Sequence, residues 1–298
     1  MTKKILINGK EYRFTSTAIK DKASRESYFD LAQKVFGLDF GPWYQSGFFN
    51  DSFIPYTLFD NGIAVSSVGV VINNFRWGGT TKKYAQISTV MTDPDYRMQG
   101  LSRWLTEKVI EEWKNKCDSI YLYANDSVAE FYPKFGFVPV DEYRYSLPVT
   151  KKDGQYRKLN LSVQSDVDLL IKKHKESNPF SLLATEDAAG IMMFHCITFL
   201  HDNIFYIEKY DAIVIAEQDG HGIFCHDIYS SGHADICDIL GTIVFAEPCI
   251  ATLGFTPKTP LGYTIKKANE NDTILFVLDG MKNILAENKI TFPFLTRA

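Results

Sequence analysis

The residues best suited to chemistry lie where a β-rich run leads into a predicted helix. The run 87–92 (ISTVMT) ends at Asp93, and the loop that follows, with Arg97 and Gly100, opens a helical pattern over 101–116. A helix start offers unpaired N–H groups and the positive end of a dipole, and glycine lets a ligand approach the backbone closely. The pattern predicts a site for a phosphorylated ligand. The alternative is a polar loop in which Gly100 serves only the turn, and this segment alone does not decide between them.

Two segments resemble the signatures of the GCN5-related N-acetyltransferase (GNAT) superfamily. The pyrophosphate loop of that family reads Arg/Gln-x-x-Gly-x-Gly/Ala, and this chain has Arg97-x-x-Gly100-x-Ser102. Serine departs from the usual residue at the last position but is small enough for a close approach. The segment 125–137 (NDSVAEFYPKFGF) is similar to the second signature, in which Asn opens a short helix followed by Tyr-x-Lys-x-Gly-Phe. The resemblance covers residues 58–147 and extends to the N-terminal helical region.

The resemblance implies acetyl transfer from acetyl-CoA, the cosubstrate, to a primary amine of a small-molecule or peptide acceptor, by direct attack in a ternary complex. Amides of the strand before the loop would bind the pantetheine arm and stabilise the oxyanion that develops at the thioester carbonyl. Amides of residues 98–102 would bind the pyrophosphate, with added charge from two arginines, and an asparagine would close the far wall of the cleft. The cofactor-binding residues implied in this way are Val90, Met91, Thr92, Arg97, Met98, Gln99, Gly100, Leu101, Ser102, Arg103 and Asn125.

Tyr132 occupies the position at which the family commonly has its general acid. A phenol, with an ordinary pKa of about 10, can protonate the thiolate that leaves the tetrahedral intermediate. The alternative is that Tyr132 only packs the short helix onto the sheet. No general base is evident, because the strand 83–92 contains no Asp or Glu, and the amine proton would have to leave through water or through the hydroxyls of Ser88 and Thr89.

Acceptor specificity in the family comes from the segment after the first helix, here residues 36–53. Aromatic and acidic side chains in this segment would suit a cationic amine. The alternative, at least as strong, is that the aromatic residues belong to an ordinary core. The side chains concerned are Asp39, Trp43, Tyr44, Phe48, Phe49 and Asp51.

The elements that must position these residues follow from turn signals and hydrophobic periodicity. Asn8-Gly9 predicts a hairpin turn, and apolar residues recur at helical spacing over 23–36 and 101–116. The predicted strands are 4–7, 11–14, 54–59, 63–75, 83–92, 119–124 and 137–146, and a short helix covers 127–135. The resemblance implies an α+β (mixed α/β) GNAT fold, in which helices flank a central, mostly antiparallel, twisted sheet.

A polar connector over 147–154 predicts a division into two domains, a GNAT acetyltransferase domain at 1–147 and a second α+β domain at 155–298. Residues 253–257 (LGFTP) echo residues 135–139 (FGFVP), and both precede a predicted strand. This echo suggests that the second domain is a degenerate GNAT-like copy. The second half has no Arg/Gln-x-x-Gly-x-Gly loop, so we expect it to close the acceptor site or to form a homodimer interface.

Composition limits the partners. The chain has 32 Lys and Arg against 36 Asp and Glu, a net charge of −4, and no basic stripe, so we expect no nucleic acid partner. Its longest apolar stretches are too short to span a bilayer, and no signal peptide is evident, so we expect a cytoplasmic protein with no membrane partner. Five cysteines without a Cys-x-x-Cys pair predict neither disulfides nor zinc. The cluster of His221, Cys225, His226 and His233 has hairpin spacing rather than ligand spacing.

Two other functions fit the same residues. The missing carboxylate base leaves open a regulatory protein that binds CoA without turnover. A tandem-domain transferase that uses another acyl donor, such as aminoacyl-tRNA, is a further alternative, which the intact pyrophosphate loop and the absence of a basic surface disfavour.

Overall fold

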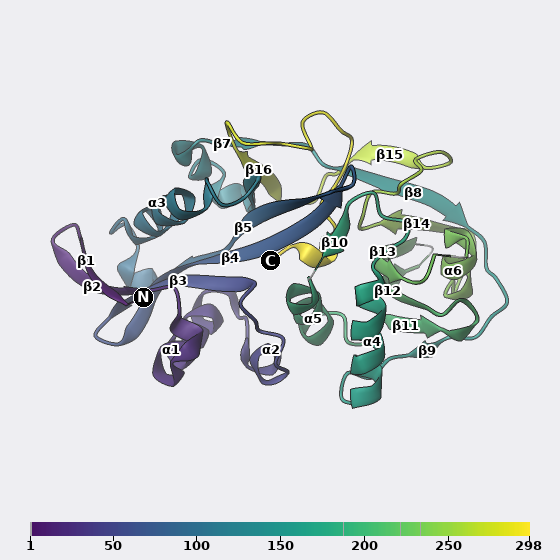
Figure 1. Ribbon diagram of the computed structural model, residues 1–298, viewed down its shortest axis with the longest axis horizontal. Coiled ribbons are helices and arrows are strands. Elements are labelled where there is room, and N and C mark those ends of the chain that lie inside the picture. The colour runs from purple at the N-terminus through teal and green to yellow at the C-terminus, as the bar shows by residue number, and fades with distance from the viewer. Residues whose placement is uncertain (1, 187, 221, 233) are drawn as a thin grey trace.

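The computed structural model describes residues 2–186, 188–220, 222–232 and 234–298, and it contains two β-sheets that lie side by side (Figure 1). The first sheet has the order β1-β2-β3-β4-β5-β6-β16-β7, with β10 paired to β4. The second has the order β15-β8-β14-β13-β12-β11-β9. Most neighbouring strands in both sheets are antiparallel, which confirms the predicted α+β class.

The first sheet consists of β1 (Lys3–Ile7), β2 (Lys10–Thr15), β3 (Phe53–Asp60), β4 (Ile63–Trp77), β5 (Thr80–Thr92), β6 (Ser119–Ala124), β7 (Phe137–Pro139), β10 (Ala184–Glu186) and β16 (Ile274–Leu278). The second consists of β8 (Tyr143–Val149), β9 (Arg157–Lys158), β11 (Ile204–Ile207), β12 (Ala212–Asp219), β13 (Gly222–Tyr229), β14 (Cys249–Leu253) and β15 (Thr264–Lys267). The α-helices are α1 (Lys22–Phe36), α2 (Gly41–Gln45), α3 (Leu101–Trp113), α4 (Gln164–Glu176), α5 (Ala189–Thr198) and α6 (Ile236–Thr242).

Helices cover both faces of the first sheet. Successive residues of a strand point to opposite faces, so that Val70 belongs to the core cluster beneath α3 and Val71 to the cluster beneath α1, α2 and α5. The apolar stripe of α3, which includes Leu105 and Val109, packs into the first of these clusters. Asp21 caps the start of α1 by accepting a hydrogen bond from the Ser24 amide.

Each sheet contains a strand from the other half of the chain between two of its own strands. β16, from the second half of the chain, lies between β6 and β7 of the first sheet, and β8, from the first half, lies between β14 and β15 of the second. The predicted strand 137–146 is therefore wrong as a single element, because the chain leaves one sheet after Pro139 and enters the other at Tyr143. The predicted ranges of the two domains, 1–147 and 155–298, stay a prediction about folding units.

The two sheets repeat one pattern of pairing. In the first, β4–β5 is antiparallel, β5–β6 is parallel and is joined through α3, and the next two pairs, with β16 and β7, are antiparallel. The second sheet has the same order of pairings. There β12–β13 is antiparallel, β13–β14 is parallel and joined through α6, and β14–β8 and β8–β15 are antiparallel. This correspondence agrees with the expectation that the second half is a GNAT-like copy.

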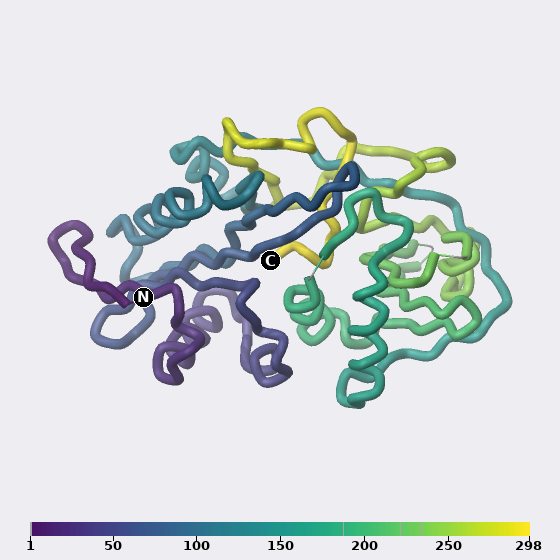
Figure 2. The backbone as a smooth tube through the Cα atoms, in the orientation of Figure 1, coloured from purple at the N-terminus to yellow at the C-terminus, as the bar shows by residue number. Residues whose placement is uncertain are grey.

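The last residues of the chain join the two halves. Figure 2 shows this segment returning beside the first sheet. Phe292 stacks on Tyr121 of β6 with ring centroids 4.3 Å apart, and the Gln86 Nε2 of β5 donates a hydrogen bond to the Ala298 carbonyl at 3.0 Å. Buried Arg297 forms an ion pair with Glu142 at 3.0 Å. The segment therefore ties β5 and β6 to the connection between the sheets.

The exchanged strand gives a test of the fold. Phe276 of β16 is buried in the core of the first sheet, so we expect Phe276→Ala to lower the free energy of unfolding by about 3–5 kcal/mol. All four tryptophans, Trp43, Trp77, Trp104 and Trp113, lie in the first half of the chain, so tryptophan fluorescence during urea unfolding reports on the first sheet. The control is Leu261→Ala, since Leu261 is 87% exposed. An unshifted tryptophan transition in the Phe276 variant would contradict the strand exchange.

Candidate functional site

The first sheet opens between β5 and β6. The two strands pair in parallel only from Tyr84↔Ser119 to Ile87↔Leu122. Beyond that point β5 continues to Thr92 with β4 as its neighbour, whereas β6 pairs with β16 up to Ala124↔Ile274. The last residues of β5 thus have backbone groups on the β6 side with no strand partner in the described part of the chain.

A β-bulge turns this part of β5. The register moves from Ser67↔Met91 to Gly69↔Ser88, which places one extra residue on β5, and Thr89 there has φ +42°. Glycine is required opposite the bulge, because a Cβ at Gly69 would lie 2.5 Å from the Thr89 Oγ1.

Beyond the bulge, the register decides which amides of β5 are free. The Asp93 amide donates to the Val65 carbonyl of β4 at 2.9 Å. Because hydrogen-bonding residues alternate along an antiparallel pair, the Met91 amide also points toward β4, and the amides of Val90 and Thr92 point away from it. Two donors therefore face the opening between β5 and β6.

The loop after β5 has a fixed and unusual backbone. Asp93 is buried, and although burial opposes ionisation, hydrogen bonds from Lys34 and from the Asp95 amide hold the pKa of Asp93 below its ordinary value. Met98, which is fully exposed, has φ +61°, and Gly100 has φ +78°. Two left-handed residues so close together turn the chain sharply into α3.

The start of α3 is free to receive an anion. Gly100 is its N-cap, no side chain of the described residues caps it, and its first turn has no acidic residue. In α6, by contrast, Asp235 caps the helix and Asp238 lies in the first turn. Arg97 and Arg103 are exposed on either side of Gly100, and Arg103 has Glu107 as an ion-pair partner at 3.5 Å. Free amides, a helix dipole and two guanidinium groups fit a diphosphate.

Asn125, predicted for the far wall of the cofactor cleft, lies directly after β6. Its Nδ2 donates to the Asp272 Oδ2 at 2.8 Å, and the Asp126 amide donates to the Asp272 Oδ1 at 2.8 Å. These two bonds lower the pKa of Asp272, which ends the turn before β16. Sequence reasoning missed Asp272, and no local signal marks it, because 147 positions separate it from Asn125.

Tyr132 lies in the same core cluster as Leu101 at the start of α3 and Ala124 at the end of β6. It is 5% exposed, and its ring packs against those of Phe137 and Phe276 at centroid distances of 6.1 and 6.0 Å. Burial raises the pKa of Tyr132 to about 12, so its hydroxyl is protonated at neutral pH. The ring of Tyr132 therefore packs in the core, and its role as a general acid stays a prediction.

The aromatic segment after α1 is mainly core. Trp43 and Phe49 are buried in the cluster beneath α1, and the Trp43 Nε1 donates to the Gly190 carbonyl of α5 at 2.9 Å. Tyr44 and Asp51 instead line a cavity of about 520 Å³ at the edge of the sheet, together with Lys20, Arg25, Phe49 and Glu112. Trp43 is thus a core residue, as the alternative expected, whereas Phe49 packs in the core and also lines the cavity.

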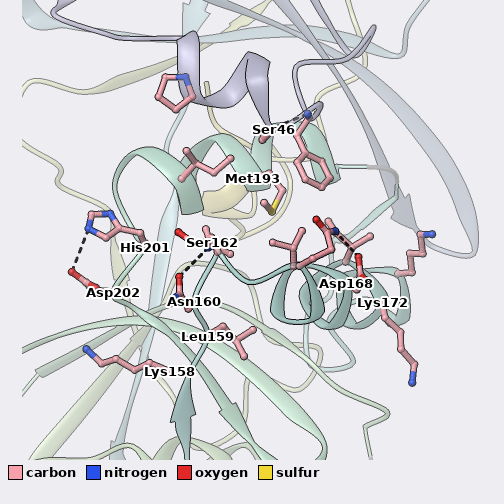
Figure 3. Close-up of a pocket in the computed structure, with 18 residues that line it drawn as sticks. Ser46, Lys158, Leu159, Asn160, Ser162, Asp168, Lys172, Met193, His201 and Asp202 are labelled. Carbon is pink, nitrogen blue, oxygen red and sulfur yellow. Dashed lines mark hydrogen bonds and ion pairs between the residues drawn. The ribbon is translucent and has the colours of Figure 1, made fainter.

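A larger cavity, of about 1120 Å³, lies elsewhere, between α2, α4 and α5 (Figure 3). Met193 and Ile197 of α5 line it, whereas Ile191 and Phe194 of the same helix pack into the cluster that contains Met91. Helix α5 therefore separates this cavity from β5. None of the predicted cofactor residues lines it.

In the second sheet, the position that corresponds to the opening between β5 and β6 lies between β13 and β14, and residues of the chain itself fill it. His226 is the extra residue of a bulge in β13, and its Nε2 lies 2.8 Å from the Glu217 Oε2. A Cβ at Gly254 would lie 2.9 Å from the His226 carbonyl and 3.0 Å from the Phe294 Cβ. His221 and His233 lie outside the described residues. Across the described ranges, no group of three or more His, Cys, Asp or Glu could hold a metal ion, and no helix is long and apolar enough to cross a membrane.

Comparisons with known proteins agree with this geometry. Residues 21–140 match the family model of the acetyltransferase (GNAT) domain. Among solved structures, the chain is similar to Eis1 from Mycobacterium abscessus, with TM-score 0.54 and 13% identity over 87% of this chain and 72% of that one. It is also similar to the probable N-acyltransferase from Enterococcus faecalis V583, with TM-score 0.53 and 14% identity over 94% and 73% of the two chains. For the GCN5-related N-acetyltransferase from Kribbella flavida, the TM-score is 0.53 and the identity 14% over 89% and 70%.

No curated protein sequence gave a match. At these identities the structural likeness establishes the fold, and the family model matches residues 21–140, the segment that carries the loop before α3. Residues 21–140 are therefore similar to an acetyltransferase (GNAT) domain, and they lie in a fold whose two sheets share one pairing pattern.

Proposed function

We propose that this protein is an acetyl-CoA-dependent N-acyltransferase with one active site, in its first half. The proposal rests on one observation, that two sets of free backbone N–H donors lie close together along the chain. The outward amides of Val90 and Thr92 lie at one end of a short loop, and the uncapped start of α3 at Gly100 lies at the other. A ligand with a diphosphate and a polarisable carbonyl would use both sets.

In this proposal the amides of residues 98–102 bind the pyrophosphate of CoA, and Arg97 and Arg103 add positive charge. The pantetheine arm lies along the free edge of β5, beside Val90, Met91 and Thr92. Asn125, held by Asp272, forms the far wall. CoA supplies the activated thioester, and the chain supplies binding and orientation.

The reaction we propose is direct attack by the acceptor amine on the thioester carbonyl. A C–N bond forms and the C–S bond breaks, while the amides of Val90 and Thr92 stabilise negative charge on the carbonyl oxygen. Tyr132 donates its proton to the departing thiolate, and the amine proton passes to water. The Ser88 hydroxyl, buried at the bulge with no hydrogen-bond partner in the described part of the chain, is a candidate to orient that water.

The acceptor in this proposal is a small-molecule or peptide amine. Net charge −4 argues against a nucleic acid partner. All five cysteines are free, which is typical of a reducing compartment and supports a cytoplasmic location. A regulatory protein that binds CoA without turnover remains the second candidate, because no carboxylate base is present on β5.

Calorimetric titration with acetyl-CoA, with CoA and dephospho-CoA alongside, tests the proposal first. We expect saturable binding at one site per chain, since α6 is capped by Asp235 and the second opening is filled. Release of thiol with amine acceptors then separates an enzyme from a CoA sensor. No binding of acetyl-CoA would contradict the proposal.

Gly100→Glu is expected to abolish CoA binding without unfolding the protein. The carboxylate would enter the site meant for the pyrophosphate and repel it. The matched control is Gly100→Ala, which carries the same cost of about 1–2 kcal/mol for a side chain at positive φ but no charge. Equal melting temperatures of the two variants, with binding lost only in the glutamate variant, are the expected result. Retained binding by folded Gly100→Glu would show that the site lies elsewhere.

Tyr132→Phe is expected to leave the Kd for acetyl-CoA nearly unchanged and to lower kcat by about 10²-fold, because the lost interaction belongs to the transition state. Burial places the Tyr132 pKa at about 12, and the protonated phenol is the active form. The wild-type rate should therefore show no alkaline decline assignable to this group below about pH 11. Equal turnover by the variant would remove Tyr132 as the acid.

A further inference from the structure

The hairpin of β1 and β2 projects beyond the first sheet and reaches the loop before α3. Within the described part of the chain, β1 pairs only with β2, and β2 pairs with β3 only over Arg13–Thr15. The turn Asn8-Gly9 has positive φ at both residues, +48° and +82°, as a two-residue hairpin turn requires. At this tip the Asn8 Nδ2 donates to the Gln99 carbonyl at 2.8 Å, although 91 positions separate the two residues.

Gln99 is held from two further sides. The buried Tyr12 of β2 donates from its hydroxyl to the Gln99 Oε1 at 3.0 Å, and the Gln99 Nε2 donates to the Asp95 carbonyl at 3.3 Å. Next to them, the Lys10 ammonium forms an ion pair with Asp60 at 2.7 Å and lies 4.9 Å from the ring centroid of Tyr96. The hairpin therefore contacts the loop at its start and at its end.

The bond from Asn8 fixes the orientation of one peptide. In a planar trans peptide the C=O and the following N–H point in opposite directions. Because the Gln99 carbonyl points toward the hairpin, the Gly100 N–H points away from it, toward the exposed side of the loop. The peptide concerned joins Gln99 to Gly100, and it lies between two left-handed residues, Met98 at φ +61° and Gly100 at φ +78°. Because glycine accepts either orientation of this peptide, it has little to prevent its rotation without the bond from Asn8.

We propose that Asn8 and Tyr12 are positioning residues for the pyrophosphate, and that the hairpin keeps the Gly100 N–H directed at the bound anion. This inference rests on the proposed function, because it assigns the hairpin to the same CoA site. Neither side chain touches the cofactor in this proposal. Both act through Gln99, Asn8 on its carbonyl and Tyr12 on its side chain.

Asn8→Gly and Tyr12→Phe test the proposal, since each removes one hydrogen bond and little else. Glycine keeps the positive φ that the turn needs, and phenylalanine keeps the buried ring. We expect each variant to bind CoA about 3- to 10-fold more weakly, the range for one lost hydrogen bond, and to raise the KM for acetyl-CoA with kcat unchanged. Lys4 lies on the same hairpin and forms an ion pair with Glu11, away from Gln99, so Lys4→Gln is the matched control and should behave as the wild type.

An acyl donor that lacks the diphosphate distinguishes a loss of pyrophosphate positioning from a general loss of active-site structure. Acetyl-pantetheine makes no pyrophosphate contact, so wild type, Asn8→Gly and Tyr12→Phe should use it at equal rates. Equal loss with both donors would overturn the proposal, as would unchanged CoA affinity in both variants.

Nuclear magnetic resonance of the free protein tests the peptide orientation without any ligand. In glycine-labelled protein we expect one sharp Gly100 amide signal for the wild type and a doubled or broadened signal for Asn8→Gly, with Gly100→Ala identifying the peak. An unchanged Gly100 signal would overturn the proposal. Failure of the proposed function is distinct, because it appears as absence of CoA binding by the wild type.

Discussion

Backbone N–H and C=O groups need hydrogen-bond partners. At the end of β5, those on the β6 side have no strand partner in the described part of the chain. Parallel pairing with β6 stops at Ile87↔Leu122, yet β5 continues to Thr92 alongside β4. The bulge at Thr89 is accommodated because residue 69 is a glycine, and it determines which amides face the opening. The start of α3 adds further free donors a few residues later. Other features of the first half, the hairpin contact with Gln99 and the Asp272 contact with Asn125, hold the two sides of this opening in place.

Local signals in the sequence are strong enough to predict much of this site. Glycine at a helix start, a β-rich run before it and the Asn8-Gly9 turn are short-range patterns, and the structure has a strand, a loop, a helix and a hairpin at those places. The parts that could not be predicted depend on contacts between distant positions. Nothing near β16 indicates that it belongs between β6 and β7, and nothing near Asn8 indicates Gln99 as its partner. The roles of Trp43 and Phe49 were equally open, since an aromatic side chain suits a pocket and a core alike.

The two sheets show how one scaffold can carry different chemistry. Both have a bulge at the corresponding strand and a single parallel pair joined through a helix. In the first sheet the helix starts with glycine and no carboxylate, whereas in the second it starts with Asp235, which satisfies the Cys237 amide and would repel a phosphate. Phe294 then packs where the second opening would be, against Gly254 and His226. A few side chains thus determine which copy is suited to an anionic ligand.

The exchange of β8 and β16 affects how the protein can be made. A chain leaves the ribosome from its N-terminus, and independent domains usually fold in that order. Here the neighbour that β6 and β7 share is β16, whose first residue, Ile274, follows the last residue of β7, Pro139, by 274 − 139 = 135 positions, so the first sheet cannot close until that later segment has been synthesised. During that interval the edge of β6 is exposed to pairing with other chains. Translation speed and chaperone access should therefore influence the yield of this protein more than they would for two domains joined end to end.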